Sequence, residues 1–131
     1  VITPDGGTLI VAETLAGRLT AFDVGGDGTL SRRRIWASLT WCAPDGICLD
    51  ADGRIWVSNA ISPECILVAE GGEIVERVTT SQICFACMLG GSDRRTLYLM
   101  TAPISTESVV STVRSARIEQ ARVEVAGAGL P

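Results

Sequence analysis

The chain has 131 residues, the length of one domain, with a net charge of −4 and no histidine. The acidic balance argues against nucleic acid as a partner, since nucleic-acid binding needs clustered Lys and Arg. No apolar run approaches the roughly 20 residues of a membrane span, so we expect no membrane partner either. Without histidine there is no Ser-His triad and no His-based zinc site, so any chemistry must use carboxylates or a metal. The five cysteines, an odd number, and a start unlike a signal peptide indicate reduced thiols and a cytoplasmic protein.

Short strands are predicted almost throughout, and no helix. Three runs rich in β-branched and aromatic residues come first and are separated by Gly-rich turns, at residues 8–14, 18–24 and 32–39. Four further strands are predicted at 46–50, 54–60, 65–70 and 73–80. The last three are predicted at 85–91, 96–102 and 116–125.

The turns before these strands repeat along the chain. Asp5, Asp52 and Asp93 each stand just before a strand, at spacings of 47 residues (5 to 52) and 41 residues (52 to 93). A four-stranded unit with a period of about 40 to 50 residues is typical of a β-propeller blade. We therefore predict a single all-β domain with blade units at about 1–42, 43–82 and 83–126 and a flexible tail at 127–131.

Three Asp-Gly pairs are predicted to be hairpin turns, because glycine tolerates the positive φ angles that such turns need. They are Asp5-Gly6, Asp27-Gly28 and Asp52-Gly53.

Asp45 has a different place, because it precedes the strand predicted at 46–50, where the chain returns from the edge of one blade to the centre of the next. A five-residue strand of about 17 Å separates it from Asp52, which places Asp45 at a channel mouth. A carboxylate there is suited to a hard cation such as calcium, but calcium takes about 6 to 8 oxygens. The residues alone leave both readings of Asp45 open, a turn residue or a ligand.

The cysteines are predicted to be structural. Cys84 and Cys87 form a C-x-x-C motif, but residues three apart on a strand face opposite sides, and no second pair or histidine completes a metal site. Cys42, Cys48 and Cys65 are scattered along the chain and are expected to be inert.

Other polar and aromatic residues have simple structural interpretations. Arg32, Arg33 and Arg34 are predicted to protect the outer edge of a blade with charge. Glu13 ends a strand and is either a solvated charge or a group that orients a ligand or water. The tryptophans are predicted to pack between blades; they are Trp36, Trp41 and Trp56.

Several stretches resemble one known family. The most specific is PDGICLDADGRIWV, and ITPDGGTLIVAET, CFACMLGG, RRTLYLMTAP and VEVAGAGLP accompany it. Together they closely resemble the senescence-marker-protein/gluconolactonase/luciferin-regenerating family over essentially the whole chain. The resemblance implies a six-bladed β-propeller that binds a divalent metal, often calcium, in its central channel and hydrolyses sugar lactones. The aspartate of PDG, a metal ligand and proposed general base in that family, falls on Asp45.

The resemblance also implies ligands that this chain does not contain. The family takes a glutamate from its first blade and an asparagine from an Asn-Gly that would fall immediately before Val1. We therefore expect the C-terminal half of a propeller, two blades and most of a third, which the missing half or a second copy would close. The expected function is part of a metal-dependent sugar lactonase using calcium, zinc or another divalent ion. The alternative is a non-catalytic propeller fragment that acts as a scaffold or interaction module.

Overall fold

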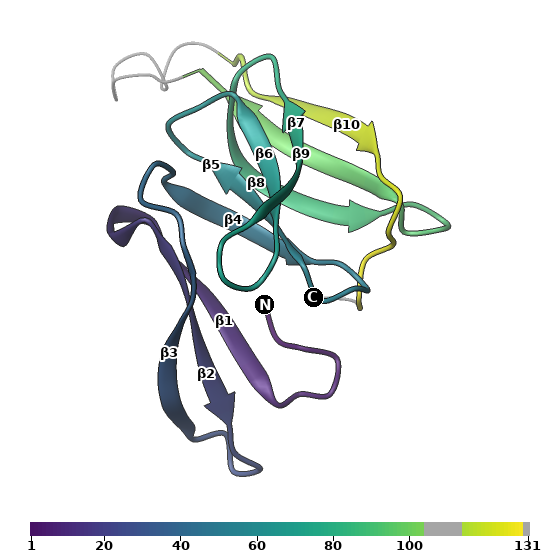
Figure 1. Cartoon of the computed structure of the whole chain (residues 1–131). Helices are drawn as coiled ribbons and strands as arrows, with labels where there is room; N and C mark the ends of the chain where they lie inside the picture. The colour runs from purple at the N-terminus through teal and green to yellow at the C-terminus, as the bar shows by residue number, and fades with distance from the viewer. Residues whose placement is uncertain (104–113, 130–131) are drawn as a thin grey trace.

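Three antiparallel sheets stand side by side (Figure 1). The computed structural model describes residues 1–103 and 114–129, and within them the fold is all-β, as predicted. The first sheet contains β1 (Thr8–Glu13), β2 (Arg18–Val24) and β3 (Leu30–Ser38). The second contains β4 (Pro44–Leu49), β5 (Ile55–Asn59), β6 (Glu64–Val68) and β7 (Ile74–Thr79). The third contains β8 (Ile83–Gly90), β9 (Thr96–Ala102) and β10 (Arg117–Arg122).

Each sheet is a meander of consecutive strands, and every strand predicted from the sequence is present with its ends moved by a few residues at most. Among the described residues the one helical element is a short 3-10 turn at Thr14–Ala16, which the sequence did not predict. No helix in this part of the chain is long and apolar enough to cross a membrane.

The first and third sheets each have three strands where the second has four. Ahead of β1, Ile2 forms a bridge with Leu9, and the backbones of Val1 and Ile10 exchange two hydrogen bonds of 2.9 Å. The first residues therefore lie where β4 lies in the second sheet. In the third sheet no described strand follows β10, and the expected absence of a fourth strand stays a prediction.

The three Asp-Gly hairpins are confirmed. Gly6, Gly28 and Gly53 have φ angles of 72°, 83° and 79°, which side-chain-bearing residues rarely adopt. The carboxylates of Asp5 and Asp27 each accept a hydrogen bond of 3.0 Å from the backbone N–H two residues further on.

At the hairpin between β4 and β5 the turn is held by Asp50, which the sequence analysis treated only as the end of a strand. Its carboxylate is fully buried and accepts hydrogen bonds from the backbone N–H groups of Asp52 (3.0 Å) and Arg54 (2.8 Å) and from Arg54 Nε (2.8 Å). Asp52 is 60% exposed, and among the described residues its side chain pairs only with the Arg54 guanidinium. The two aspartates therefore have unequal structural roles.

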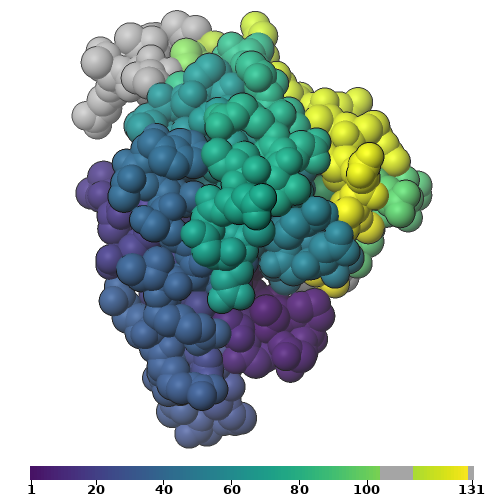
Figure 2. Space-filling view, viewed as in Figure 1, coloured from purple at the N-terminus to yellow at the C-terminus, as the bar shows by residue number. Residues whose placement is uncertain are grey.

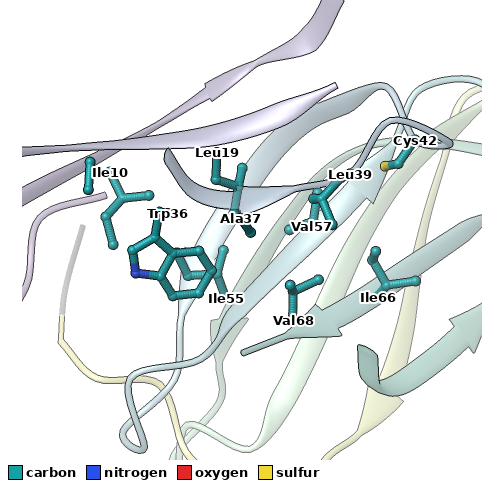
Figure 3. Packing of buried hydrophobic residues seen from close by; sticks show 11 residues of the cluster. Ile10, Leu19, Trp36, Ala37, Leu39, Cys42, Ile55, Val57, Ile66 and Val68 are labelled. Carbon is teal, nitrogen blue, oxygen red and sulfur yellow. The ribbon is translucent and has the colours of Figure 1, made fainter. Parts of the chain in front are cut away.

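The two middle strands of the second sheet are buried on both faces because a sheet packs on either side of them. All positions of β5 and β6 are buried, and successive residues of β5 point into different cores. Ile55 and Val57 join the core shared with the first sheet (Figure 3). Trp56 joins the core shared with the third sheet.

Two of the three tryptophans pack between sheets as predicted. Trp36 and Trp56 are 5% and 1% exposed. The prediction was wrong for Trp41, which is 46% exposed and has the Arg77 guanidinium 5.8 Å from its ring centroid. Trp41 lies in the connection between β3 and β4 rather than on a strand, so the pleat does not direct its side chain into a core.

The two end sheets lie on opposite sides of the second one, with β3 in blue at one side of Figure 2 and β10 in yellow at the other. As predicted, the arginines of β3 form a charged, exposed edge: Arg32 and Arg34 pair with Asp23, and Arg33 pairs with Glu13. Such charge opposes pairing of the edge with other chains.

The first residues of the predicted tail are hydrogen-bonded to the second sheet. Gly127 forms a bridge with Asp50, and two hydrogen bonds flank it, from Ala51 N to Ala126 O (2.8 Å) and from Ala128 N to Leu49 O (3.0 Å). Backbone groups near the β4–β5 hairpin provide the hydrogen-bond partners of this segment. The amino-acid composition of the segment does not indicate them. Residues 130 and 131, also predicted as tail, lie outside the described residues.

Strand β4 packs against β8 across the boundary between the second and third sheets. A methyl group at Gly46 would lie 2.6 Å from Ala86 Cα and 3.0 Å from Phe85 O. Both of these atoms belong to the backbone, so no side-chain rotation can move them away from the added methyl group. Glycine at position 46 is therefore required by the approach of the two strands rather than by its own φ angle.

Replacing Asp50 should destabilise the protein far more than replacing Asp52. Asp50→Ala removes the acceptor for two backbone N–H groups and one guanidinium, so we expect a loss of about 1–3 kcal/mol in the free energy of unfolding. Asp52→Asn keeps an exposed polar side chain and should cost less than about 0.5 kcal/mol. Urea denaturation of both variants measures the difference, and equal losses would show that Asp50 does not hold the hairpin.

Gly46→Ala should destabilise the contact between β4 and β8. The added methyl overpacks two backbones, and we expect a loss of about 1–3 kcal/mol in the free energy of unfolding. Gly26→Ala is the matched control, because a methyl there meets nothing within 4 Å. Thermal or urea unfolding tests the pair, and a neutral Gly46→Ala would mean that the two strands separate easily.

Candidate metal site at the start of strand β4

Asp45 lies inside strand β4 rather than before it. The strand begins at Pro44, which pairs with Asn59, and the next regular pair is Ile47 with Val57. Between these pairs β4 has two residues, Asp45 and Gly46, where β5 has one. This is a β-bulge, which bends a strand and redirects its side chains. The predicted start of the strand at residue 46 was two residues late because the bulge interrupts the alternation that marks a strand.

The Asp45 side chain is exposed and uncommitted. No described residue forms a hydrogen bond or ion pair with its carboxylate, in contrast to Asp50 and Asp52 at the far end of the same strand. As predicted, Asp45 and Asp52 stand at opposite ends of β4. An exposed carboxylate without a protein partner has both oxygens free for a cation.

The backbone leading to Asp45 is held by a buried amide that the sequence analysis missed. Asn59 is 1% exposed, and its Oδ1 accepts hydrogen bonds from the N–H groups of Ala43 (3.1 Å) and Ile61 (3.3 Å). Its Nδ2 donates to Glu64 Oε1 at 2.8 Å, and Glu64 also pairs with Arg77. An asparagine at a strand end was the only signal in the sequence, and asparagine is equally common in turns.

These neighbours hold the strand in place but provide no free oxygen for a metal. Both ends of the Asn59 amide are used, and the carboxylate of Glu64 is shared between Asn59 and Arg77. Within residues 1–103 and 114–129 no group of three or more His, Cys, Asp or Glu side chains could hold a metal ion. Because calcium takes about 6 to 8 oxygens, the described residues do not fit a complete calcium site.

Glu13 is the centre of an ion-pair network in the first sheet. Its carboxylate, at the end of β1, accepts hydrogen bonds from Arg18 (2.7 Å) and the Thr20 hydroxyl on β2 and from Arg33 (2.8 Å) on β3. The Arg18 guanidinium, followed by the Thr20 hydroxyl, lowers the pKa of Glu13 to about 2. Glu13 is therefore held in ion pairs rather than being only a solvated charge, and a role in orienting a ligand or water stays a prediction.

The prediction that Cys84 and Cys87 face opposite sides was wrong. Strand β8 has a register shift between Cys84, which pairs with Thr101, and Ala86, which pairs with Met100. The extra residue restores both cysteines to one face, and they are buried in the same core. Cys48 and Cys65 lie in that core too, so only Cys42 stands apart from the others.

The contribution of Glu13 to stability should depend on pH. Its pKa lies below the ordinary 4.5, so the stability that its ionised form provides is present above about pH 4.5 and is lost as pH falls toward 2. We expect Glu13→Gln to be less stable than the parent protein at pH 6. The difference in the free energy of unfolding between the two proteins should shrink as the pH falls from about 4.5 toward 2. Glu73→Gln, an exposed control, should show no such trend. A difference that stays constant with pH would contradict the role of the ion pairs.

Solved structures share this arrangement of sheets. A luciferin-regenerating enzyme superposes with a TM-score of 0.81 at 17% identity, covering 97% of this chain and 46% of its own. A regucalcin from Agrobacterium tumefaciens, described as a calcium-binding protein, superposes with a TM-score of 0.78 at 18% identity, covering 96% of this chain and 45% of its own. A gluconolactonase from Xanthomonas campestris has 29% identity and a TM-score of 0.65, covering 78% of this chain and 33% of its own.

This chain thus spans less than half the length of each of these proteins. Its three sheets correspond to that part of their six-bladed propellers. Residues 1–103, which include all of β1 to β9 and Asp45, match the family described as the SMP-30/gluconolactonase/LRE-like region. The chain therefore belongs to the SMP-30/gluconolactonase/LRE-like family.

Proposed function

We propose that this chain is part of a metal-dependent hydrolase that opens sugar lactones, and that Asp45 contributes one carboxylate to its divalent cation. The proposal rests on one observation, the exposed and unpaired carboxylate of Asp45 in a chain that belongs to this family. Its side chain is exposed and unpaired among the described residues, while the neighbouring polar side chains are committed to protein partners. A relative described as a calcium-binding protein makes calcium the first candidate, ahead of zinc or another divalent ion.

Asp45 is also proposed as the general base for ring opening. A carboxylate that is not held in an ion pair is available to accept a proton from the water that attacks a lactone carbonyl. The bulge at Asp45 and Gly46 and the Asn59 hydrogen bond to Ala43 fix the backbone from which this carboxylate projects. Sugar lactones as substrates follow from the gluconolactonase among the similar structures.

The remaining ligands must come from outside the described residues, since one carboxylate cannot fill the shell of a calcium ion. The partial coverage of the relatives' chains supports this division. The end sheets have large apolar side chains exposed at their surfaces, among them Ile35 (60%) and Ile118 (75%). We propose that the rest of a propeller or a second copy of this chain covers them. Five free cysteines fit the reducing cytoplasm as its location.

The alternative function is a non-catalytic scaffold. It is favoured by one observation, that the described residues bring no second acidic ligand to Asp45. The two functions differ in what happens when the full set of propeller blades is present. A lactonase then gains calcium binding and activity, whereas a scaffold gains neither.

Asp45→Asn tests the proposal in an assembled propeller that contains this chain and the other blades. The substitution keeps the shape of the side chain but removes a ligand charge and a possible base. We expect calcium affinity to fall by at least about 100-fold, since changes even to outer-shell groups cost about 10- to 100-fold. Lactone hydrolysis should fall by about 100-fold or more, the usual contribution of a general base. Calcium titration and a pH-stat assay with gluconolactone measure the two effects.

Asp52→Asn is the matched control, since Asp52 lies in the hairpin at the other end of β4 and should leave both quantities within about twofold. Equal and mild effects of the two substitutions would mean that Asp45 is a bulge residue without a catalytic role. An assembled protein that neither binds calcium nor opens lactones would favour the scaffold.

A further inference from the structure

Four of the five cysteines gather in the core between the second and third sheets. Cys48 comes from β4, Cys65 from β6, and Cys84 and Cys87 from β8, and each is at most 4% exposed. All of them are free thiols. The β8 bulge brings Cys84 and Cys87 to one face, so the cluster exists only because the strand departs from regular alternation.

The sulfur atoms in this core are in contact. The Cys48 thiol donates to Cys87 Sγ with the two sulfurs 3.8 Å apart, and Cys65 contacts both Cys84 and Cys87. Cys84 in turn lies 3.3 Å from the Ser58 hydroxyl. All the thiol-to-thiol contacts join the second sheet to the third, so a bond formed along any of them would link two blades.

Within the contacting pair of Cys48 and Cys87, Cys87 is the thiol suited to react first. It accepts hydrogen bonds from Cys48 and from Cys65, and these lower its pKa below that of an ordinary cysteine. Burial raises the pKa of Cys65, which remains protonated. Cys48 also lines a cavity of about 850 Å³ between the first residues of the chain and strands β4 and β8. A small oxidant can therefore approach the pair from the Cys48 side.

We propose that Cys48 and Cys87 form a peroxide-sensitive pair that oxidises to a disulfide between β4 and β8. The separation of 3.8 Å must close to a bond of about 2.0 Å, so the two short side chains must rotate toward each other. This inference is independent of lactone hydrolysis, because it concerns thiols that have no role in the proposed reaction.

The chemistry balances with hydrogen peroxide as the oxidant. The Cys87 thiolate attacks one peroxide oxygen, the O–O bond breaks, hydroxide leaves, and Cys87 becomes a sulfenic acid. Cys48 sulfur then attacks the Cys87 sulfur, the S–O bond breaks, and the hydroxyl leaves as water with the proton of the Cys48 thiol. Two thiols and one peroxide give one disulfide and two waters.

The bond would form beside the candidate metal site. Cys87 Sγ lies 3.5 Å from the carbonyl oxygen of Gly46, the residue next to Asp45. A disulfide at this point holds β4 to β8 covalently where Gly46 already brings their backbones together. The disulfide would therefore hold β4 and β8 together when the peroxide concentration rises. Thiol reductants would break it and restore the two free cysteines.

Peptide mapping tests this in the purified full chain. Since the chain contains no lysine, trypsin cleaves only at arginine and places Cys48, Cys65 and Cys87 in separate peptides, 35–54, 55–77 and 78–94. The folded protein is treated with hydrogen peroxide, free thiols are alkylated, and the digest is analysed without reduction. We expect peptide 35–54 linked to 78–94, with fragment ions that place the bond on Cys48 and Cys87, and loss of the link with dithiothreitol.

Cys48→Ser and Cys87→Ser should each reduce this link by at least tenfold, while Cys42→Ser, the matched control from the other core, should keep it. If a variant does not fold, the mapping of the parent protein still decides the question. A bond through Cys42 or Cys65, oxidation of single cysteines without a link, or the same yield in urea-unfolded protein would each overturn the proposal.

Discussion

The approach of β4 to β8 is the constraint on which the rest of this structure depends. The two strands come so close at Gly46 that a single methyl group would meet the backbone of Ala86 at 2.6 Å. Both strands have a β-bulge near this contact, at Asp45 in β4 and after Cys84 in β8. A bulge changes the face to which following side chains point. The exposed carboxylate and the buried cysteine cluster thus each depend on a bulge near this contact.

Three carboxylates of this chain have different roles because their surroundings differ. Asp50 is fully buried and holds a hairpin through three hydrogen bonds. Glu13 joins the strands of the first sheet through two arginines. Asp45 alone among these three has neither a buried position nor a partner among the described residues. A buried or paired carboxylate stabilises the fold, whereas an unpaired one at a bulge is free to bind something else.

The exposed end sheets and the single unpaired carboxylate both occur in a chain that spans less than half of its relatives' length. Calcium takes about 6 to 8 oxygens, and the described residues bring no second acidic side chain to Asp45. Large apolar side chains of the end sheets are exposed. The two middle strands of the second sheet, which have a neighbouring sheet on both faces, are buried throughout.

Turn residues, strand periodicity and the repeat of about 40 to 50 residues were enough to predict the strands, their grouping into blades and the Asp-Gly hairpins, because these features depend on neighbours close in sequence. The PDG stretch also indicated Asp45 as the candidate ligand. Only the tertiary structure placed Cys84 and Cys87 on one face, tied the C-terminal segment to Asp50, and revealed Asn59 as the anchor of the strand that contains Asp45. Bulges and hydrogen bonds between residues far apart in the sequence decide these features, and no local pattern in the sequence indicates them.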